Sequence, residues 1–107
     1  MNSITELEQS VIGSVLLDEA NLAFLPTLEL YDFQTARGRA TWQAIRNLEA
    51  DASPIDLELI AARLTRDGSL EMVTYEYLRE CELRVPTAMN AEAYAKLLRD
   101  AALKKRL

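Results

Sequence analysis

The sequence has no histidine and a single cysteine, Cys81, among its 107 residues. Without histidine it lacks the commonest biological metal ligand and the commonest general base, which excludes His-containing zinc sites and His-dependent catalytic triads. One cysteine cannot form an internal disulfide, so a reducing, cytoplasmic location is expected. The sequence therefore favours a function that does not depend on metal or triad chemistry.

Glycine and proline are also scarce, with three of each. Sheet proteins need these residues for tight turns, so the scarcity favours helices. No apolar run approaches the roughly 18 residues of a membrane span. Residues 1–8 show neither the basic nor the apolar region of a secretory signal. The length fits one domain, residues 1–107, that can bury a core without disulfides or metals.

The net charge is −5, which argues against a general nucleic-acid binder. The first 36 residues contain no Lys or Arg but six acids, which are Glu6, Glu8, Asp18, Glu19, Glu29 and Asp32. The last 12 residues contain one acid, Asp100, and five bases, which are Lys96, Arg99, Lys104, Lys105 and Arg106. This asymmetry has two interpretations: a solvated acidic face with a basic helix end that suits the helix dipole, or an acidic surface that meets a basic protein partner.

Apolar residues recur at helical spacing along the chain, which predicts an all-α, compact orthogonal bundle of about six helices and no sheet. The expected helices cover approximately residues 4–18, 21–28, 36–50, 57–67, 75–84 and 90–107. Pro26 lies inside the second segment, where it is tolerated only in the first turn or ends the helix early. Residues 30–33, with Tyr31 and Phe33, are expected to form an ordered connection held by aromatic side chains.

Capping residues support these boundaries. Ser3 precedes Glu6 by three residues, which is a capping-box pattern, and Asn21, Asp56 and Thr74 are further N-cap candidates. Gly68 is expected to be the left-handed residue after the fourth helix. No Gly, Pro or polar cap ends the last helix, whose pattern continues through Leu103 to Leu107. We therefore expect this sequence to be a fragment of a longer chain.

Acidic side chains offer the first candidates for catalysis, and a solvated helix face explains each of them better. They are Asp67 with Glu71, and the group Glu76, Glu80 and Glu82. No nucleophile lies near them, and their spacing does not match a calcium loop. No GxxxxGK[ST] or GxGxxG string is present to hold phosphate. The sequence predicts no catalytic residue, no cofactor and no metal site.

Two further side chains, Cys81 and Trp42, also have plain structural interpretations. Cys81 has no basic neighbour in sequence to activate its thiol, so a buried apolar role is expected. Trp42 could stack on nucleic-acid bases, but it shares a helix face with Ile45 and Leu48 and is expected in the core. The basic residues near the chain end are a weak signal for phosphate contacts. The sequence does not identify partner-binding residues.

Several segments, in the same order along the chain, resemble one known family. Residues 7–18, LEQSVIGSVLLD, resemble the LEAEQSVLGALLLD opening of DnaB-type replicative helicases. Residues 53–56, SPID, with Gly68-Ser69-Leu70 are similar to that family's G-x-PID…L…G-x-L stretch. Tyr77-Leu78, PTAMN at 86–90 and Tyr94-Ala95 resemble its YL…PSAAN…YA segment, while Asp32-Phe33 and WQAI at 42–45 match its DFY…IF-x-AI region. The chain resembles the family's N-terminal domain from about Leu7 to Leu107.

This resemblance implies an all-α collar domain of a hexameric DNA helicase. In the family this domain is followed by a helical pairing hairpin, a linker and a RecA-like ATPase domain. These three parts are expected to be missing here. It implies three partners: a DnaG-type primase, a helicase loader and the other subunits of the helicase ring. It implies little direct nucleic-acid binding and no membrane. A bacterial or phage origin is expected.

The sequence departs from the family at three loops. Ala52 stands where the family commonly has Gly, Val73-Thr74 replaces Gly-Gly, and residues 36–39 replace a His-Arg pair. Two other functions stay open. One is a stand-alone phage or plasmid protein of the same fold that binds the host helicase or primase as loader or inhibitor. The other, an enzyme, has the least support.

Overall fold

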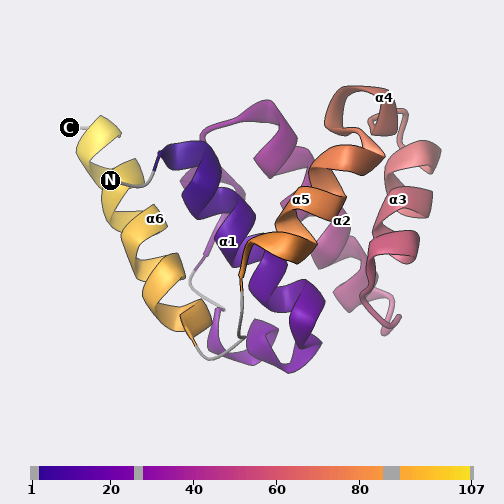
Figure 1. Ribbon diagram of the computed structural model, residues 1–107, viewed down its shortest axis with the longest axis horizontal. Coiled ribbons are helices and arrows are strands. Elements are labelled where there is room, and N and C mark those ends of the chain that lie inside the picture. Colours follow the sequence, from indigo (N-terminus) through magenta and orange to yellow (C-terminus); the bar gives the residue numbers. More distant parts are fainter. Residues whose placement is uncertain (1–2, 26–27, 86–89, 107) are drawn as a thin grey trace.

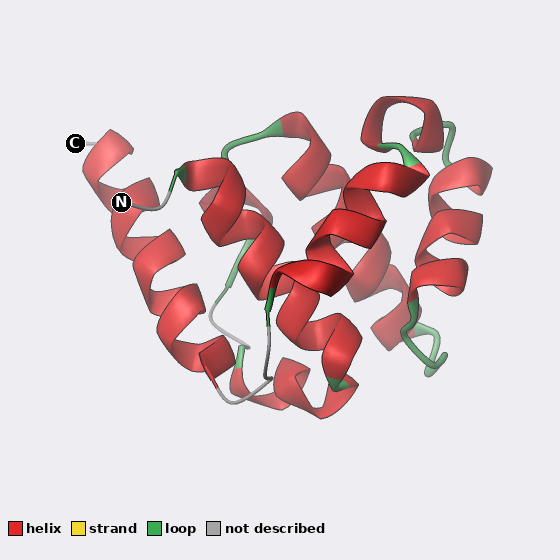
Figure 2. Ribbon diagram, viewed as in Figure 1, coloured by secondary structure: helices red, strands yellow, loops and turns green. Residues whose placement is uncertain are grey.

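The regular structure is entirely helical in the computed structural model, which describes residues 3–25, 28–85 and 90–106. Figures 1 and 2 show the arrangement. In chain order the helices are α1 (Ile4–Leu17), η1 (Glu19–Phe24), η2 (Leu30–Asp32), α2 (Ala36–Ala50), α3 (Leu57–Arg66), α4 (Leu70–Val73), α5 (Tyr75–Arg84) and α6 (Ala91–Arg106). The predicted all-α class is confirmed.

Three of the predicted N-caps are confirmed. The Ser3 hydroxyl accepts a hydrogen bond from the Glu6 N–H at 3.1 Å, and the Ser3 N–H donates to the Glu6 carboxylate at 3.5 Å, which completes the capping box. The Asp56 carboxylate caps α3 by accepting the Leu59 N–H at 2.8 Å. The Thr74 hydroxyl caps α5. These side chains satisfy N–H groups that have no partner inside the helix.

The predicted left-handed residue after α3 is also confirmed, with φ of 76° at Gly68. The Gly68 N–H donates to the Thr65 carbonyl at 3.1 Å, and the next N–H donates to Leu64 at 2.8 Å, which is a Schellman motif. Helix α2 ends in the same way, but its left-handed residue is Ala52, with φ of 56°. A left-handed L-residue costs about 1–2 kcal/mol, so this turn keeps a conformation better suited to glycine.

The second predicted helix is wrong in type and in its cap. Residues Glu19–Phe24 form a short 3₁₀-helix, and Asp18 caps it by accepting the Ala20 N–H at 3.0 Å. Asn21 lies inside this helix, and its amide donates to the Ser14 carbonyl at the end of α1 instead. Asp18 both ends α1 and starts η1, so the chain turns three residues earlier than predicted. Pro26 lies outside the described residues.

Helix α4 was not predicted. It is one turn long, from Leu70 to Val73, and Val73 is its buried anchor. Such a short element shows no repeating apolar pattern, so periodicity cannot detect it. It places Thr74 at the start of α5 with φ of 72° and ψ of 146°, which is unusual for a β-branched residue.

Helix α1 forms the centre of the molecule. It packs against α5 on one side and α6 on the other, while α2 and α3 form the far end (Figure 1). Its middle nine residues, from Leu7 to Val15, are all buried. The α1–α5 contact is close because Gly13 faces the Cys81 carbonyl, where an added Cβ would lie only 2.1 Å from that oxygen.

The buried face of α1 also carries polar side chains. The Gln9 amide donates to Glu80 at 3.1 Å and accepts from the Arg84 guanidinium at 3.1 Å. The Ser14 hydroxyl donates to the Ser10 carbonyl one turn earlier at 2.8 Å. Each of these groups is hydrogen-bonded, which offsets the cost of removing it from water. The α1–α5 interface is therefore fixed by polar links as well as by packing.

Candidate interaction surfaces

The acidic residues that were weighed as catalytic candidates do not form a site. Asp67 and Glu71 lie at the exposed end of α3 and the start of α4. Glu76 is exposed on α5, Glu80 accepts the Gln9 amide, and Glu82 pairs with Arg79 at 4.0 Å. Within the described ranges, no group of three His, Cys, Asp or Glu side chains could hold a metal ion.

Cys81 and Trp42 occupy the core, as predicted. Burial raises the pKa of the Cys81 thiol to about 12, which keeps it protonated at neutral pH. Trp42 is fully buried. Its ring stacks on Phe33 with the centroids 5.0 Å apart, and the Arg46 guanidinium carbon lies over the ring, 5.0 Å from its centroid. The indole is therefore not available to stack on a base.

Glu8 is a buried acid that joins α1 to the N-terminus of α2. Its carboxylate accepts the backbone N–H of Gln34 at 2.6 Å and of Thr35 at 3.2 Å, and it also accepts the Thr35 hydroxyl. The positive end of the α2 dipole favours a carboxylate there. A Cβ at Gly38 would lie 2.1 Å from Glu8 Oε1, so glycine leaves the room that this carboxylate occupies. The role of Glu8 is structural.

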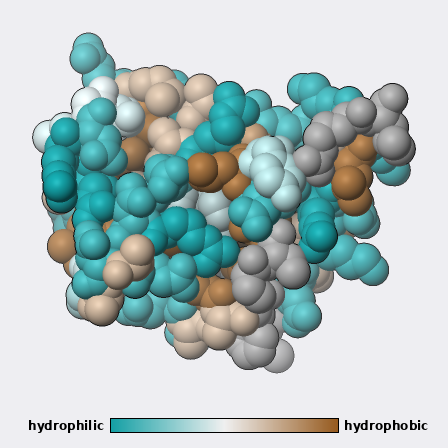
Figure 3. Space-filling model, turned by 180° about the vertical axis from the view of Figure 1, so that it is seen from behind, coloured by the Kyte–Doolittle hydropathy of each residue, from teal (hydrophilic) through white to brown (hydrophobic). Residues whose placement is uncertain are grey.

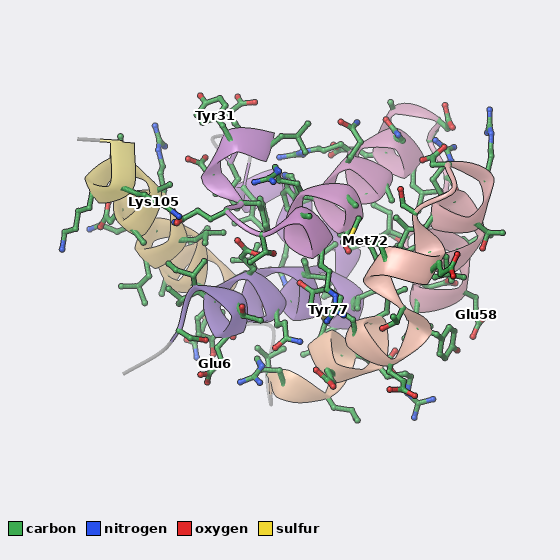
Figure 4. All side chains as sticks on the ribbon, turned by 90° about the horizontal axis from the view of Figure 1, so that it is seen from above. Glu6, Tyr31, Glu58, Met72, Tyr77 and Lys105 are labelled. Carbon is green, nitrogen blue, oxygen red and sulfur yellow. The ribbon has the colours of Figure 1, made fainter. Side chains whose placement is uncertain are left out.

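One surface groove lies where η2, the start of α2 and the end of α6 meet, and we call it the η2–α6 groove. It has a volume of about 390 Å³. The residues that line it are Tyr31, Phe33, Gln34, Arg39, Ala102 and Lys105. Figure 4 shows Tyr31 from η2 and Lys105 from α6 at the same end of the molecule, with Glu58 at the opposite end. Two of the lining residues are cationic and none is acidic.

Two further grooves differ from it in charge. The α3–α5 groove, of about 310 Å³, contains three acids and one base and is lined by Asp56, Leu57, Glu58, Tyr75, Arg79 and Glu82. In it the Tyr75 hydroxyl donates to Glu58, which raises the pKa of Tyr75. The η1–α2 groove, of about 370 Å³, contains Glu19 and Glu49 among otherwise uncharged residues. Anion binding is therefore disfavoured in both of these grooves.

Exposed apolar side chains are scattered over several elements. They include Leu17 at 45% exposure, Met72 at 43%, Leu83 at 74% and Leu103 at 48%. The face seen in Figure 3 is mainly hydrophilic, with small separate apolar areas. The connection at residues 30–33 is ordered, as expected, with the Phe33 ring buried beneath it and Tyr31 61% exposed. Leu107, expected to extend the apolar end of α6, lies outside the described residues.

The sequence did not point to Glu8, Gln34 or Arg39. Glu8 stands one helical turn from Ile4, Val11 and Ile12, and an acid on this apolar stripe is the only signal that the sequence offers. Arg39 follows the α2 N-terminus, and its Nη1 donates to the Phe33 and Gln34 carbonyls, both at 3.1 Å. The hydrogen-bond partners of these three residues lie in the connection before α2 or on another helix. Apolar periodicity does not predict which of these separate segments contact each other.

The fold defines this chain as an all-helical domain. Its described surface presents grooves for contact, and the described residues show no cluster of chemically reactive side chains. The model of the DnaB-like helicase N-terminal domain family matches residues 1–100. The chain belongs to this family. None of the described helices is long and apolar enough to cross a membrane.

Curated relatives agree with this assignment. The chain is 34% identical over 106 residues to "Replicative DNA helicase DnaB" of Geobacillus stearothermophilus, covering 95% of this chain and 23% of the relative. It is 36% identical to the protein of the same name from Mycobacterium leprae, covering 94% and 17%, and 32% identical to that of Haemophilus influenzae, covering 96% and 22%. The chain thus spans about a fifth of the length of these relatives.

A solved structure shows the same fold. The crystal structure of the N-terminal domain of DnaB helicase from Mycobacterium tuberculosis matches with a TM-score of 0.92 and 35% sequence identity. The match covers 95% of this chain and 72% of that one. The predicted resemblance is confirmed in sequence and in structure.

Proposed function

We propose that this chain is the N-terminal collar domain of a cytoplasmic replicative DNA helicase and works as a protein-interaction module. In this role it supports assembly of the helicase ring and receives a primase, a helicase loader or both during DNA replication. The observation that carries the proposal is the agreement of sequence and fold over 95% of the chain with a DnaB N-terminal domain.

The chemistry of the described residues is consistent with this role. Buried acids and polar groups such as Glu8 and Gln9 are engaged in joining helices. The core takes up Trp42 and Cys81. In this proposal ATP hydrolysis belongs to a separate ATPase domain, and DNA binding by this domain is weak because the net charge is −5.

The coding sequence downstream of Leu107 tests the first part of the proposal. We expect an open reading frame that continues through a helical hairpin and a linker into a domain with a phosphate-binding GxxxxGK[ST] motif. A stop codon directly after Leu107 would contradict the collar assignment and favour a stand-alone protein of the same fold.

A further inference from the structure

The η2–α6 groove is lined by one anchored cation, Arg39, by a second cation, Lys105, and by aromatic and small apolar residues. The Arg39 guanidinium is anchored at its wall, because Nη1 donates to both the Phe33 and Gln34 carbonyls at 3.1 Å. A cation held in place in this way loses little freedom when it binds an anion. Lys105 approaches from α6, and Ala102 lies one turn before it. The aromatic residues Tyr31 and Phe33 complete the lining.

The groove also holds a polar group that lacks a partner. The side-chain amide nitrogen of Gln34 is buried and has no hydrogen-bond partner. A buried donor without an acceptor costs free energy, and a turn of the Gln34 side chain toward the groove would let an incoming oxygen atom recover it. Gln34, Arg39 and Lys105 are therefore three donors that line one groove, and none of the lining residues is a carboxylate.

We infer that this groove docks an acidic segment of a partner protein. One carboxylate of the segment binds between Arg39 and Lys105, and a neighbouring apolar side chain packs on Tyr31 and Ala102. Charge complementarity selects this occupant, since the other two grooves carry acids and this one carries cations on a chain of net charge −5. The inference deepens the proposed function and rests on it for the claim that the occupant is a protein.

The test is a titration of the 107-residue chain with a blocked peptide, acetyl-LEDF-amide. Two-dimensional amide NMR measures the binding. We expect saturable shifts confined to residues 31–34, 39 and 102–105, with a Kd of about 1 mM or tighter. The matched peptide acetyl-LQNF-amide has the same shape without charge and should bind about tenfold more weakly, as expected when two carboxylates are lost. Equal binding of the two peptides, or no saturable shift, would overturn the proposal.

Two lysine variants separate the groove from the general charge of the helix end. Lys105→Glu should weaken binding of the acidic peptide about five- to tenfold. Lys104→Glu removes the same charge from the same helix turn, and Lys104 is exposed but does not line the groove, so binding should change less than about twofold. Both substituted side chains are exposed in the native chain, and equal melting temperatures would verify folding. Equal weakening by the two variants would overturn the proposal.

A third titration, with an oligonucleotide of eight deoxythymidines, distinguishes nucleic acid from protein. If the oligonucleotide shifts the same residues and binds more tightly than acetyl-LEDF-amide, the groove is a single-strand site and the proposal is wrong. Weaker binding by the oligonucleotide supports it. If the 107-residue chain binds the peptide but its coding sequence stops directly after Leu107, the proposed function is wrong and the groove chemistry still holds.

Discussion

Thr74 combines a useful side chain with an unfavourable backbone conformation. Its hydroxyl accepts the Tyr77 N–H at 3.1 Å and caps α5, but its φ of 72° is rarely adopted by β-branched residues. Such conformations cost about 1–3 kcal/mol. In this chain the cap partly offsets the strain.

Replacing Thr74 with glycine should stabilise the fold by about 1 kcal/mol. Glycine relieves the strain, and as an N-cap it is only a few tenths of a kcal/mol worse than threonine. Thr74→Ala keeps the strain and loses the cap, so it should destabilise by about 1 kcal/mol. Urea unfolding of the three proteins measures both effects. A glycine variant less stable than the alanine variant would show that the positive φ stores no strain.

Trp42 is the largest fully buried side chain, and it holds the 30–33 connection through its stack with Phe33. Trp42→Ala should cost about 3–5 kcal/mol, a large share of the roughly 5–15 kcal/mol expected for a small domain. Thermal unfolding should show a much lower melting temperature or no cooperative transition. Leu83→Ala, which truncates a side chain that is 74% exposed, is the control and should change stability by less than about 0.5 kcal/mol. An unchanged melting temperature for Trp42→Ala contradicts the core assignment.

At the scale of the helices, α1 and α5 approach each other closely at Gly13. Gly13→Ala would place a Cβ 2.1 Å from the Cys81 carbonyl oxygen, so the two backbones must move apart. Overpacking of this kind typically costs about 1–3 kcal/mol, against a gain of about 1 kcal/mol in helix propensity. We expect a net loss of stability by chemical denaturation. The exposed α1 variant Thr5→Ala serves as the control, and a Gly13 variant more stable than the native chain would refute the close contact.

The long helices could be predicted from sequence because each contains an apolar repeat, and recognisable caps mark several of their ends. The boundaries at Ser3, Asp56 and Gly68 agree with the structure for this reason. The 3₁₀-helix Glu19–Phe24 was mistaken for an α-helix because Asp18 and Asn21 are both good caps and only the fold decides between them. Helix α4 is too short to show a period.

The η2–α6 groove could not be predicted from the sequence. It joins residues 31–39 to residues 102–105, which lie about 65 positions apart in the chain. A single sequence reveals local repeats, but pairing of distant segments depends on how α6 packs beside α1. In one interpretation of the sequence, the basic residues at the chain end suit the dipole of the last helix. In the structure, Lys105 of this group also lines a groove together with Arg39.

At the scale of the whole molecule, the described surface offers no extended apolar face. The exposed apolar residues are dispersed over several elements, and stable interfaces usually bury about 1,200–2,000 Å². The isolated chain should therefore be a monomer or a weak dimer and not a hexamer. Light scattering at tens of micromolar, where contacts of about −6 to −7 kcal/mol become visible, measures this. A stable hexamer would show that this domain carries the ring contacts by itself.

We propose that this domain receives other replication proteins. The most direct measurement is a calorimetric titration of the chain with the C-terminal helicase-binding domain of the primase encoded in the same genome. We expect saturable binding with a Kd in the micromolar range, about −7 to −8 kcal/mol, and no heat with a primase that lacks this domain. Absence of binding to the primase domain at about 1 mM, with both proteins folded, would contradict primase docking.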